Sequence, residues 1–467
     1  MSKTSSTNQR DPLLDLWRGL ALVDMAWVHL VTYPIGVASV LALWIGEYTR
    51  FAAGAFVLIS GLSVARVFGP RLSGDPAQVR ETLRRLFRRA LMLVVLDRLV
   101  AVAFGLIERS LSVPPTVTPT YPNLVDLLTF NAPGVTGGLL SLYAILLLAT
   151  PLLDWLLRRH GALVVLAVSA SLFALAHAGG LGTHGTIWPF PVAYWQPLFV
   201  VGYVTSRRLS ALCDSSGRIA NWWLALVSVA FAVVFLFRNG ASVGVVGSAL
   251  LPDLSFVKVP LSPAELAWYL TASALVLTWS AWIWERDAWI RRVLGWLPLL
   301  GRQSLLVYMA HLFVQLVLIE ALTLLEPSTS ARVLMLPLTA LILAAIATAG
   351  ERWGRTSMPR RGSAPQLLRL LPSPVILGAA VMGGTFGAVV TLQLLVGTPA
   401  AWNLAAGGSA QIEVATTADG GAGIASAVDD DPYPEQILWL MDLEVDGNPG
   451  PFSAPEAVDP EAIESGT

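Results

Sequence analysis

The sequence predicts an all-α polytopic membrane protein, a bundle of about ten to eleven transmembrane helices with a cytoplasmic N-terminus and an outer C-terminus. Three observations support this prediction: the composition, the length of the apolar runs and the placement of the basic residues. Of the 467 residues, 55% are hydrophobic and only 13% are charged. That charged fraction is about half that of a typical soluble domain, so the composition excludes a water-soluble globule.

Eleven apolar runs are long enough to be membrane spans, because a bilayer core about 30 Å thick needs roughly 20 apolar residues per helix. The shortest run contains Pro197, so a broken or tilted helix is expected there. A further apolar stretch, 36–47, is too short to span and is expected to lie in the membrane interface. The eleven runs cover residues 13–33, 50–67, 90–107, 136–157, 162–178, 192–206, 221–237, 265–284, 303–324, 332–350 and 374–396.

The basic residues set the predicted orientation. With the N-terminus inside, the cytoplasmic segments contain 22 of the 30 Lys and Arg residues, whereas the outer segments contain five. Cytoplasmic loops of membrane proteins carry such an excess. The first run has no convincing small-residue cleavage site, so it is interpreted as a retained helix and not as a signal peptide.

The chain divides into three parts by composition. Residues 1–350 form the predicted membrane core of about ten helices, and 351–396 add a basic cytoplasmic loop and one more span. Residues 370–467 contain 13 acidic residues and no Lys or Arg, and the polar segment 397–467 is expected to be a disordered outer tail. No basic stripe suggests nucleic-acid binding. Cys213 is the only cysteine, which excludes an internal disulfide and a cysteine-rich zinc site, and no metal site is predicted.

The first run contains ionisable residues that are costly in lipid and therefore indicate a functional site. Asp15 and Arg18 lie near its cytoplasmic end, and His29 lies eleven residues after Arg18. On a helix this spacing puts Arg18 and His29 on one face, about 16 Å apart along the axis. In the structural alternative, Arg18 snorkels to the headgroups and His29 bonds a neighbouring carbonyl. The functional interpretation is favoured, since a histidine in a span usually faces a cavity.

A second polar group opens the ninth run, after Gly301 and Arg302. Ser304, Tyr308 and His311 follow at spacings of four and three, which places them on one stripe of a helix. The stripe indicates either a site or a hydrogen-bonded seam between helices.

Arginines also recur at helical spacing before the third run. A helix there would carry a cationic ridge that either meets anionic lipid headgroups or binds a polyphosphate cofactor. The ridge consists of Arg80, Arg84 and Arg88, with Arg85 and Arg89 beside it. Within the third run, Asp97 and Arg98 are expected to pair with groups on other helices, and no chemistry is assigned to them.

Several stretches together resemble a known family. They are RDPLLDLWRGLALVDMAWVHL (10–30), FVLISG (56–61), RRLFRRALMLVVL (84–96), LLSLYAILLLATPLL (139–153), FPVAYWQPLFVVGYV (190–204) and GRQSLLVYMAH (301–311). With these motifs the chain resembles the integral membrane acyltransferases of the acyltransferase-3 superfamily, most closely the OpgC-like branch. The Arg18 to His29 spacing is similar to the superfamily's signature, and the Tyr-Trp-Gln stretch before Pro197 is similar to OpgC-like proteins.

The resemblance implies transfer of an acyl group, succinyl or acetyl, from cytoplasmic acyl-CoA to a carbohydrate hydroxyl beyond the inner membrane. A thioester is already activated, so the enzyme needs a base for the acceptor and a donor for the oxyanion. His29 is the candidate base, in direct transfer or as a covalent acyl-imidazole. Arg18 would bind the carbonyl oxygen, an acyl carboxylate or a CoA phosphate.

The remaining candidate residues would hold the substrates. His311 and Tyr308 would orient the acceptor or steady His29, and Trp195 and Gln196 would offer a stacking plane and an amide to a sugar ring. Further substrate contacts are assigned to Asp15, Arg302 and Ser304, and the CoA phosphates to Arg84, Arg85, Arg88 and Arg89. The rival function is a multi-pass transporter or exporter of a glycan or lipid-linked substrate, although no repeated halves of the kind typical of transporters are visible.

Overall fold

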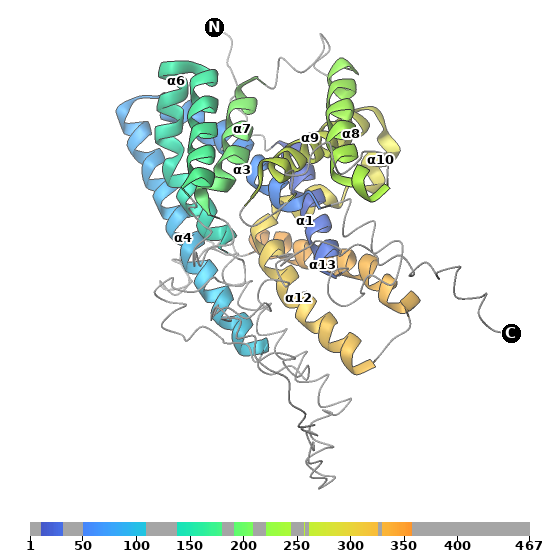
Figure 1. Ribbon diagram of the computed structural model, residues 1–467. Helices are drawn as coiled ribbons and strands as arrows, with labels where there is room; N and C mark the ends of the chain where they lie inside the picture. The colour runs from blue at the N-terminus through green and yellow to red at the C-terminus, as the bar shows by residue number, and fades with distance from the viewer. Residues whose placement is uncertain are drawn as a thin grey trace, which may run out of the picture.

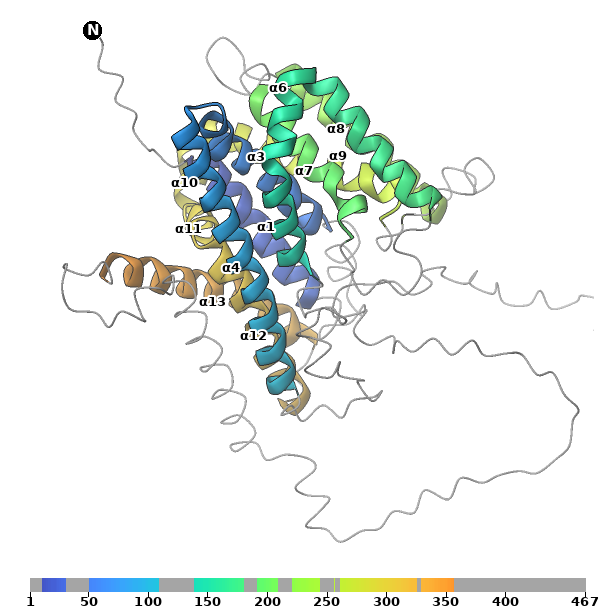
Figure 2. The same cartoon turned by 90° about the vertical axis from the view of Figure 1, so that its left-hand side faces the viewer.

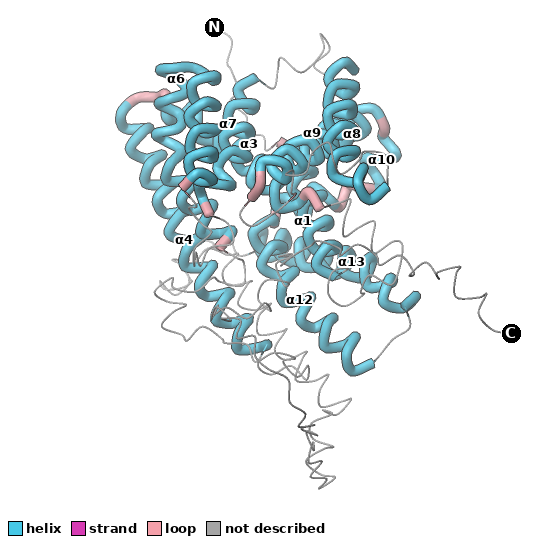
Figure 3. Tube along the Cα trace, viewed as in Figure 1, coloured by secondary structure: helices cyan, strands magenta, loops and turns pink. Residues whose placement is uncertain are grey.

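The computed structural model describes residues 11–30, 50–108, 138–179, 191–208, 221–243, 256, 261–325 and 329–356. Within these ranges the chain is helical and contains no strand (Figure 3). The longer helices are α1 (Pro12–Leu30), α3 (Ala52–Leu72), α4 (Pro76–Glu108), α6 (Leu139–Ala178), α7 (Val192–Arg208), α8 (Asn221–Val243), α9 (Pro263–Arg286), α12 (Ser304–Leu325) and α13 (Thr329–Thr356). Two short helices, α10 (Ala288–Val293) and α11 (Leu297–Arg302), lie between α9 and α12.

The helices coincide with ten of the predicted apolar runs, with two differences. Helix α4 begins at Pro76, so the arginine ridge is part of the same helix as the third run. The fourth and fifth runs are the two arms of α6, which is interrupted at Gly161 (φ 82°, ψ 175°). Glycine adopts this positive φ without the steric cost that a side chain would impose. The run 374–396, the segment 36–47 and the tail 397–467 lie outside the described residues.

Helices α1 and α3 lie between two groups of helices (Figure 1). On one side α3 packs against α7, and α4 packs against α6. On the other side α8 packs against α9, while α1 packs against α11 and α12. Turned by 90°, the same structure shows α4 running as one long helix past α12, with α13 projecting from the bundle (Figure 2). Because α1 and α3 are central, we expect a site within the bundle to be lined by these two helices.

Glycines allow the closest helix crossing. A Cβ placed on Gly61 of α3 would lie 2.1 Å from the backbone oxygen of Phe199, and one on Gly202 of α7 would lie 2.1 Å from that of Leu58. Small residues at such crossings let backbones approach closely, which is how helices associate where no water drives them together. This contact fixes α7 directly behind α3.

The apolar surface agrees with a membrane environment. In the described part of the chain, five helices are long and apolar enough to cross a membrane: α3, α6, α8, α9 and α13. Leu163 of α6 is 83% exposed and Val229 of α8 is 62% exposed, as expected for side chains that face lipid and not water. The part of the chain that the structure describes is therefore a helical membrane protein. The predicted ten to eleven spans and the orientation of the termini stay predictions.

Candidate functional site

A cavity of about 400 Å³ lies between α1, α3, α4, α6, α7 and α12. Most of its wall is apolar, including Phe56, Ile59 and Phe199. Its polar wall groups are two arginines, two tyrosines and two serines. These are Arg18, Ser60, Arg89, Tyr143, Ser304 and Tyr308. A largely apolar pocket with a few convergent polar groups is the usual form of a small-molecule site.

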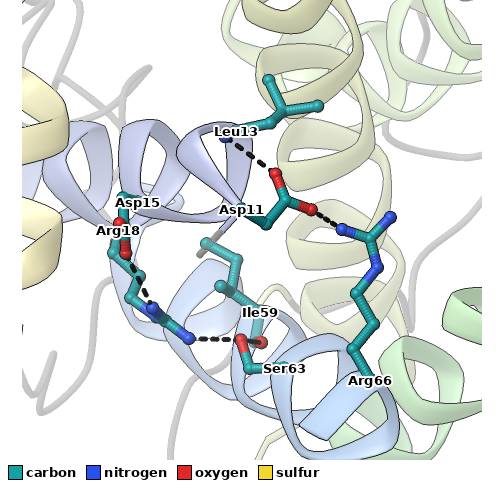
Figure 4. A network of polar contacts seen from close by, with 7 residues as sticks. All are labelled: Asp11, Leu13, Asp15, Arg18, Ile59, Ser63 and Arg66. Carbon is teal, nitrogen blue, oxygen red and sulfur yellow. Dashed lines mark hydrogen bonds and ion pairs between the residues drawn. The ribbon is translucent and has the colours of Figure 1, made fainter. Parts of the chain in front are cut away.

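Arg18 is held in place by two helices (Figure 4). Its Nη1 donates to Oδ1 of Asp15, one turn earlier on α1, at 3.1 Å, and its Nη2 donates to Oγ of Ser63 on α3 at 2.5 Å. The Ser63 hydroxyl in turn donates to the carbonyl of Ile59 at 2.6 Å. Asp15 is only 2% exposed, so the carboxylate compensates a guanidinium that would otherwise be costly among apolar helices. The fork of Arg18 is thereby fixed while it lines the cavity.

The start of α1 is tied to α3 a second time in the same view. The Asp11 carboxylate pairs with Arg66 and accepts a hydrogen bond from the backbone N–H of Leu13 at 2.9 Å. An acidic residue that accepts from the first helical N–H groups caps the helix start. The cap and the ion pair together fix the register of Arg18 against α3.

His29, His311 and Tyr308 form a row of rings from two helices. The ring centroids of His29 and His311 are 5.8 Å apart, and those of His311 and Tyr308 are 5.3 Å apart. Nδ1 of His311 contacts the carbonyl of Tyr308, and Nε2 of His311 is buried without a hydrogen-bond partner in the described structure. A neutral imidazole whose Nδ1–H donates to a carbonyl has its lone pair on Nε2. The row therefore contains a nitrogen that can accept a proton.

The cavity reaches only one end of this row. Tyr308 and Ser304 line it, whereas neither His29 nor His311 does. His311 is 1% exposed, and its ring is the neighbour of both the Tyr308 ring and the His29 ring. The predicted stripe on α12 is thus split between the cavity wall and the interior of the bundle.

The structure brings only one of the predicted phosphate-binding arginines to the cavity. Arg89 lines it, with its guanidinium 5.2 Å from the ring centroid of Phe68. Arg84, Arg85 and Arg88 are exposed and are not among the lining residues. Nε of Arg85 donates to Glu81 at 2.9 Å, and this hydrogen bond lowers the pKa of the Glu81 carboxyl below its ordinary value. The ridge is helical as predicted, and Arg89 is its member that lines the cavity.

The predicted sugar-binding residues on α7 are packed away from the cavity. Trp195 is fully buried, with its ring centroid 5.5 Å from that of Tyr269. Gln196 bonds Ser169 of α6 at both ends of its amide: its Oε1 accepts from Oγ at 2.7 Å and its Nε2 donates to the carbonyl at 2.8 Å. Arg302 is also outside the cavity and bonds Glu351 of α13 at 3.0 Å. These three side chains join helices in this structure.

Other polar residues at the site carried no functional signal in the sequence. Ser60, Ser63 and Tyr143 lie within apolar runs, where a hydroxyl often bonds only its own helix, so nothing in the sequence distinguished them. Asp97 and Arg98 were expected to pair with other helices. Ser141 of α6 donates to Asp97 at 2.8 Å, which confirms a partner on another helix for Asp97, and Arg98 Nη2 donates to Asp97 at 2.5 Å on the same helix. No group of metal-ligating side chains occurs among the described residues.

The sequence of the chain matches one known protein family over most of its length. Residues 10–355 match the family model described as OpgC protein. The chain belongs to the OpgC family. The match covers more than half of the chain, spans every helix that lines the cavity, and ends one residue before the end of α13. OpgC proteins are associated with acyltransferase activity, in which an acyl group is transferred to glucan at a membrane. No curated protein and no solved structure matches the chain.

Proposed function

We propose that this OpgC-family protein is an O-acyltransferase of the inner (plasma) membrane. It transfers a succinyl or acetyl group from cytoplasmic acyl-CoA to a hydroxyl of an extracytoplasmic glucan. The observation that carries the proposal is the cavity that presents Arg18, Arg89 and Tyr308 together inside the OpgC match. The two arginines can bind the anionic phosphates of acyl-CoA, and the apolar wall can pack against its pantetheine arm.

Tyr308 is the proposed oxyanion donor, and Arg18 is the proposed contact for a CoA phosphate or an acyl carboxylate. When the acceptor hydroxyl attacks the thioester carbon, the carbonyl oxygen gains negative charge, and donors already in position stabilise it. The Arg18 guanidinium is fixed by Asp15 and Ser63, so it is already in position to hold an anionic group of the acyl donor. A tyrosine hydroxyl is protonated at neutral pH and can donate.

His29 is the proposed general base, with His311 as its partner. The C–O bond of the ester forms as the C–S bond breaks, and the acceptor's proton passes through the imidazole to the released CoA thiolate. The His29 ring is partly exposed and lies next to that of His311. Since the described cavity ends at Tyr308, the glucan is proposed to reach His29 from the opposite side of the ring row.

The test uses the full-length protein in proteoliposomes with radiolabelled succinyl-CoA or acetyl-CoA and a soluble glucan. We expect label in the glucan and an equal amount of free CoA thiol, both dependent on the glucan. A transporter of glucan or of a lipid-linked substrate would move its substrate across the vesicle without consuming thioester. Absence of acceptor-dependent thiol release with both donors would refute the proposed function.

A further inference from the structure

The polar stripe on α12 continues one turn beyond the ring row. Gln315 follows His311 at a spacing of four, just as Tyr308 follows Ser304, so its side chain leaves the same face of the helix, with the Cβ atoms of the two residues about 5–6 Å apart. That face meets α1, because the ring centroids of His311 and His29 are 5.8 Å apart. Gln315 therefore lies beside the histidines, one turn further along α12 from Tyr308 and the cavity.

Two polar atoms on this face lack a hydrogen-bond partner. Nε2 of His311 and Nε2 of Gln315 are both buried, and neither is hydrogen-bonded within the described residues. The two residues are 1% and 4% exposed. A buried polar group without a partner destabilises a folded protein, and such groups are uncommon. A hydrogen-bonded seam between helices would satisfy these atoms, so packing alone does not account for them.

The two nitrogens are together complementary to a hydroxyl group. Nδ1 of His311 contacts the carbonyl of Tyr308, so the proton of the neutral imidazole lies on Nδ1 and the lone pair on Nε2. The side-chain amide of Gln315 donates through Nε2. A hydroxyl between them donates to the imidazole and accepts from the amide, whereas a carboxylate has no proton for the imidazole. The pair therefore favours an alcohol over an anion.

We propose that His311 and Gln315 hold a hydroxyl of the acceptor sugar, next to the hydroxyl that meets His29. This inference rests on the proposed function and makes Gln315 a specificity-determining residue for the acceptor. A sugar ring carries hydroxyls on neighbouring carbons, so one ring presents a hydroxyl to each imidazole, whereas a simple alcohol has only one to offer. Gln315 contacts the acceptor and not the acyl donor, so its loss raises KM for glucan and leaves KM for acyl-CoA unchanged.

The test replaces the Gln315 amide by an apolar side chain of the same length. In Gln315→Met we expect KM for glucan to rise about ten-fold, the effect of one lost hydrogen bond, with the wild-type KM for acyl-CoA. The melting temperature in detergent should stay at or above that of the wild type, because the variant buries no unpartnered amide. Gln315→Asn, which keeps the donor on a shorter stem, should show a smaller rise in KM for glucan.

The matched control acts on a buried amide that already has its partners. Ser169→Ala removes the hydroxyl of α6 that donates to Oε1 of Gln196 on α7 at 2.7 Å. This variant should have a lower melting temperature and wild-type KM values for both substrates. A fall in the melting temperature of Gln315→Met equal to that of Ser169→Ala would overturn the inference, because the Gln315 amide would then join helices.

Binding of glucan without acyl-CoA separates this inference from the proposed function. The soluble glucan alone should raise the melting temperature of the wild type, and should raise that of Gln315→Met less. Equal stabilisation of the two proteins, or a wild-type KM for glucan in Gln315→Met, would overturn the inference, since a buried water would then be the partner of the two nitrogens. If glucan stabilises the wild type more than Gln315→Met but acyl-CoA releases no thiol, the proposed function fails and the hydroxyl site stands.

Discussion

Replacing Tyr308 with Phe tests whether the cavity is catalytic or merely a packing defect. The substitution removes one oxygen and leaves the ring, which is 8% exposed and packs 6.4 Å from Phe56 and 5.3 Å from His311 between centroids. Because Tyr308 lines the cavity and the substitution keeps its ring, the free energy of unfolding should change by no more than about 1 kcal/mol. Loss of one oxyanion donor costs about 2.7–4 kcal/mol of transition-state stabilisation, so kcat should fall by about 10²–10³-fold.

The matched control is Tyr203→Phe, which removes a tyrosine hydroxyl outside the cavity. That hydroxyl donates to Oδ1 of the buried Asp154 at 2.8 Å. Losing a hydrogen bond to a charged group should lower the free energy of unfolding by about 1.5–3 kcal/mol, without an effect on kcat. The assay pairs thiol release from acyl-CoA with thermal unfolding in the same detergent.

The two variants should therefore separate rate from stability. Tyr308→Phe is expected to be stable and slow, and Tyr203→Phe is expected to be fast and less stable. Wild-type kcat in Tyr308→Phe would refute the assignment of Tyr308 as a donor. If both variants lost rate and stability together, the cavity would be a structural feature of the bundle, and the reasoning that places the thioester in it would be wrong.

Three further substitutions test other parts of the site and fold. His29→Ala should abolish acyl transfer, since the base is lost, while expression and membrane insertion stay normal; turnover at the wild-type rate would remove His29 from the mechanism. Arg89→Gln should raise KM for acyl-CoA by about ten-fold, the effect of one lost phosphate contact. Arg84→Gln, which changes an arginine outside the cavity lining, should leave KM unchanged. Initial rates measured over a range of acyl-CoA concentrations give KM for both variants. Gly61→Val should lower the free energy of unfolding by about 3 kcal/mol or more, because a Cβ at this position meets the α7 backbone. Gly74→Ala is the control, because a Cβ there meets the flexible end of the Gln78 side chain. Equal melting temperatures of the two variants would contradict the close crossing of α3 and α7.

The fold was predictable where apolar length determines it. Each helix of the membrane region must satisfy its own backbone and present about 20 apolar residues to lipid, so the runs in the sequence locate the helices. The same criterion missed the N-terminal half of α4, since Arg80, Arg84 and Arg88 interrupt the apolar run although they favour helix. It also missed α10, whose first turn is capped by Asp287, with Oδ1 accepting from the N–H of Trp289 at 2.7 Å.

The site was predictable only where an unusual residue type marked it. A guanidinium in an apolar run is costly enough to require a reason, and Arg18 does line the cavity. An amide gives no such signal: Gln196 has the same sequence context whether it binds a sugar or, as the structure shows, Ser169. Tyr143 and Ser60 line the cavity but look like ordinary hydroxyls in apolar helices. Of the four arginines assigned to the CoA phosphates, Arg89 lines the cavity, and the assignment of Arg84, Arg85 and Arg88 stays a prediction.

The limit of the cavity at Tyr308 leads to a prediction about the two substrates. Arg18 lines the cavity, whereas His29, on the same helix about 16 Å further along the axis, lies beyond the ring row and does not line it. If the acyl donor occupies the cavity with its thioester at Tyr308, and the glucan enters past His29, the two substrates come from opposite sides and meet at Tyr308. A CoA analogue lacking the thiol should therefore compete with acyl-CoA but not with glucan, and acyl-CoA should act only on the membrane face that carries Arg89. Vesicles of both orientations, assayed with acyl-CoA added outside, test the second expectation. Equal activity in the two preparations, or competition between the analogue and glucan, would mean that both substrates enter one common cavity.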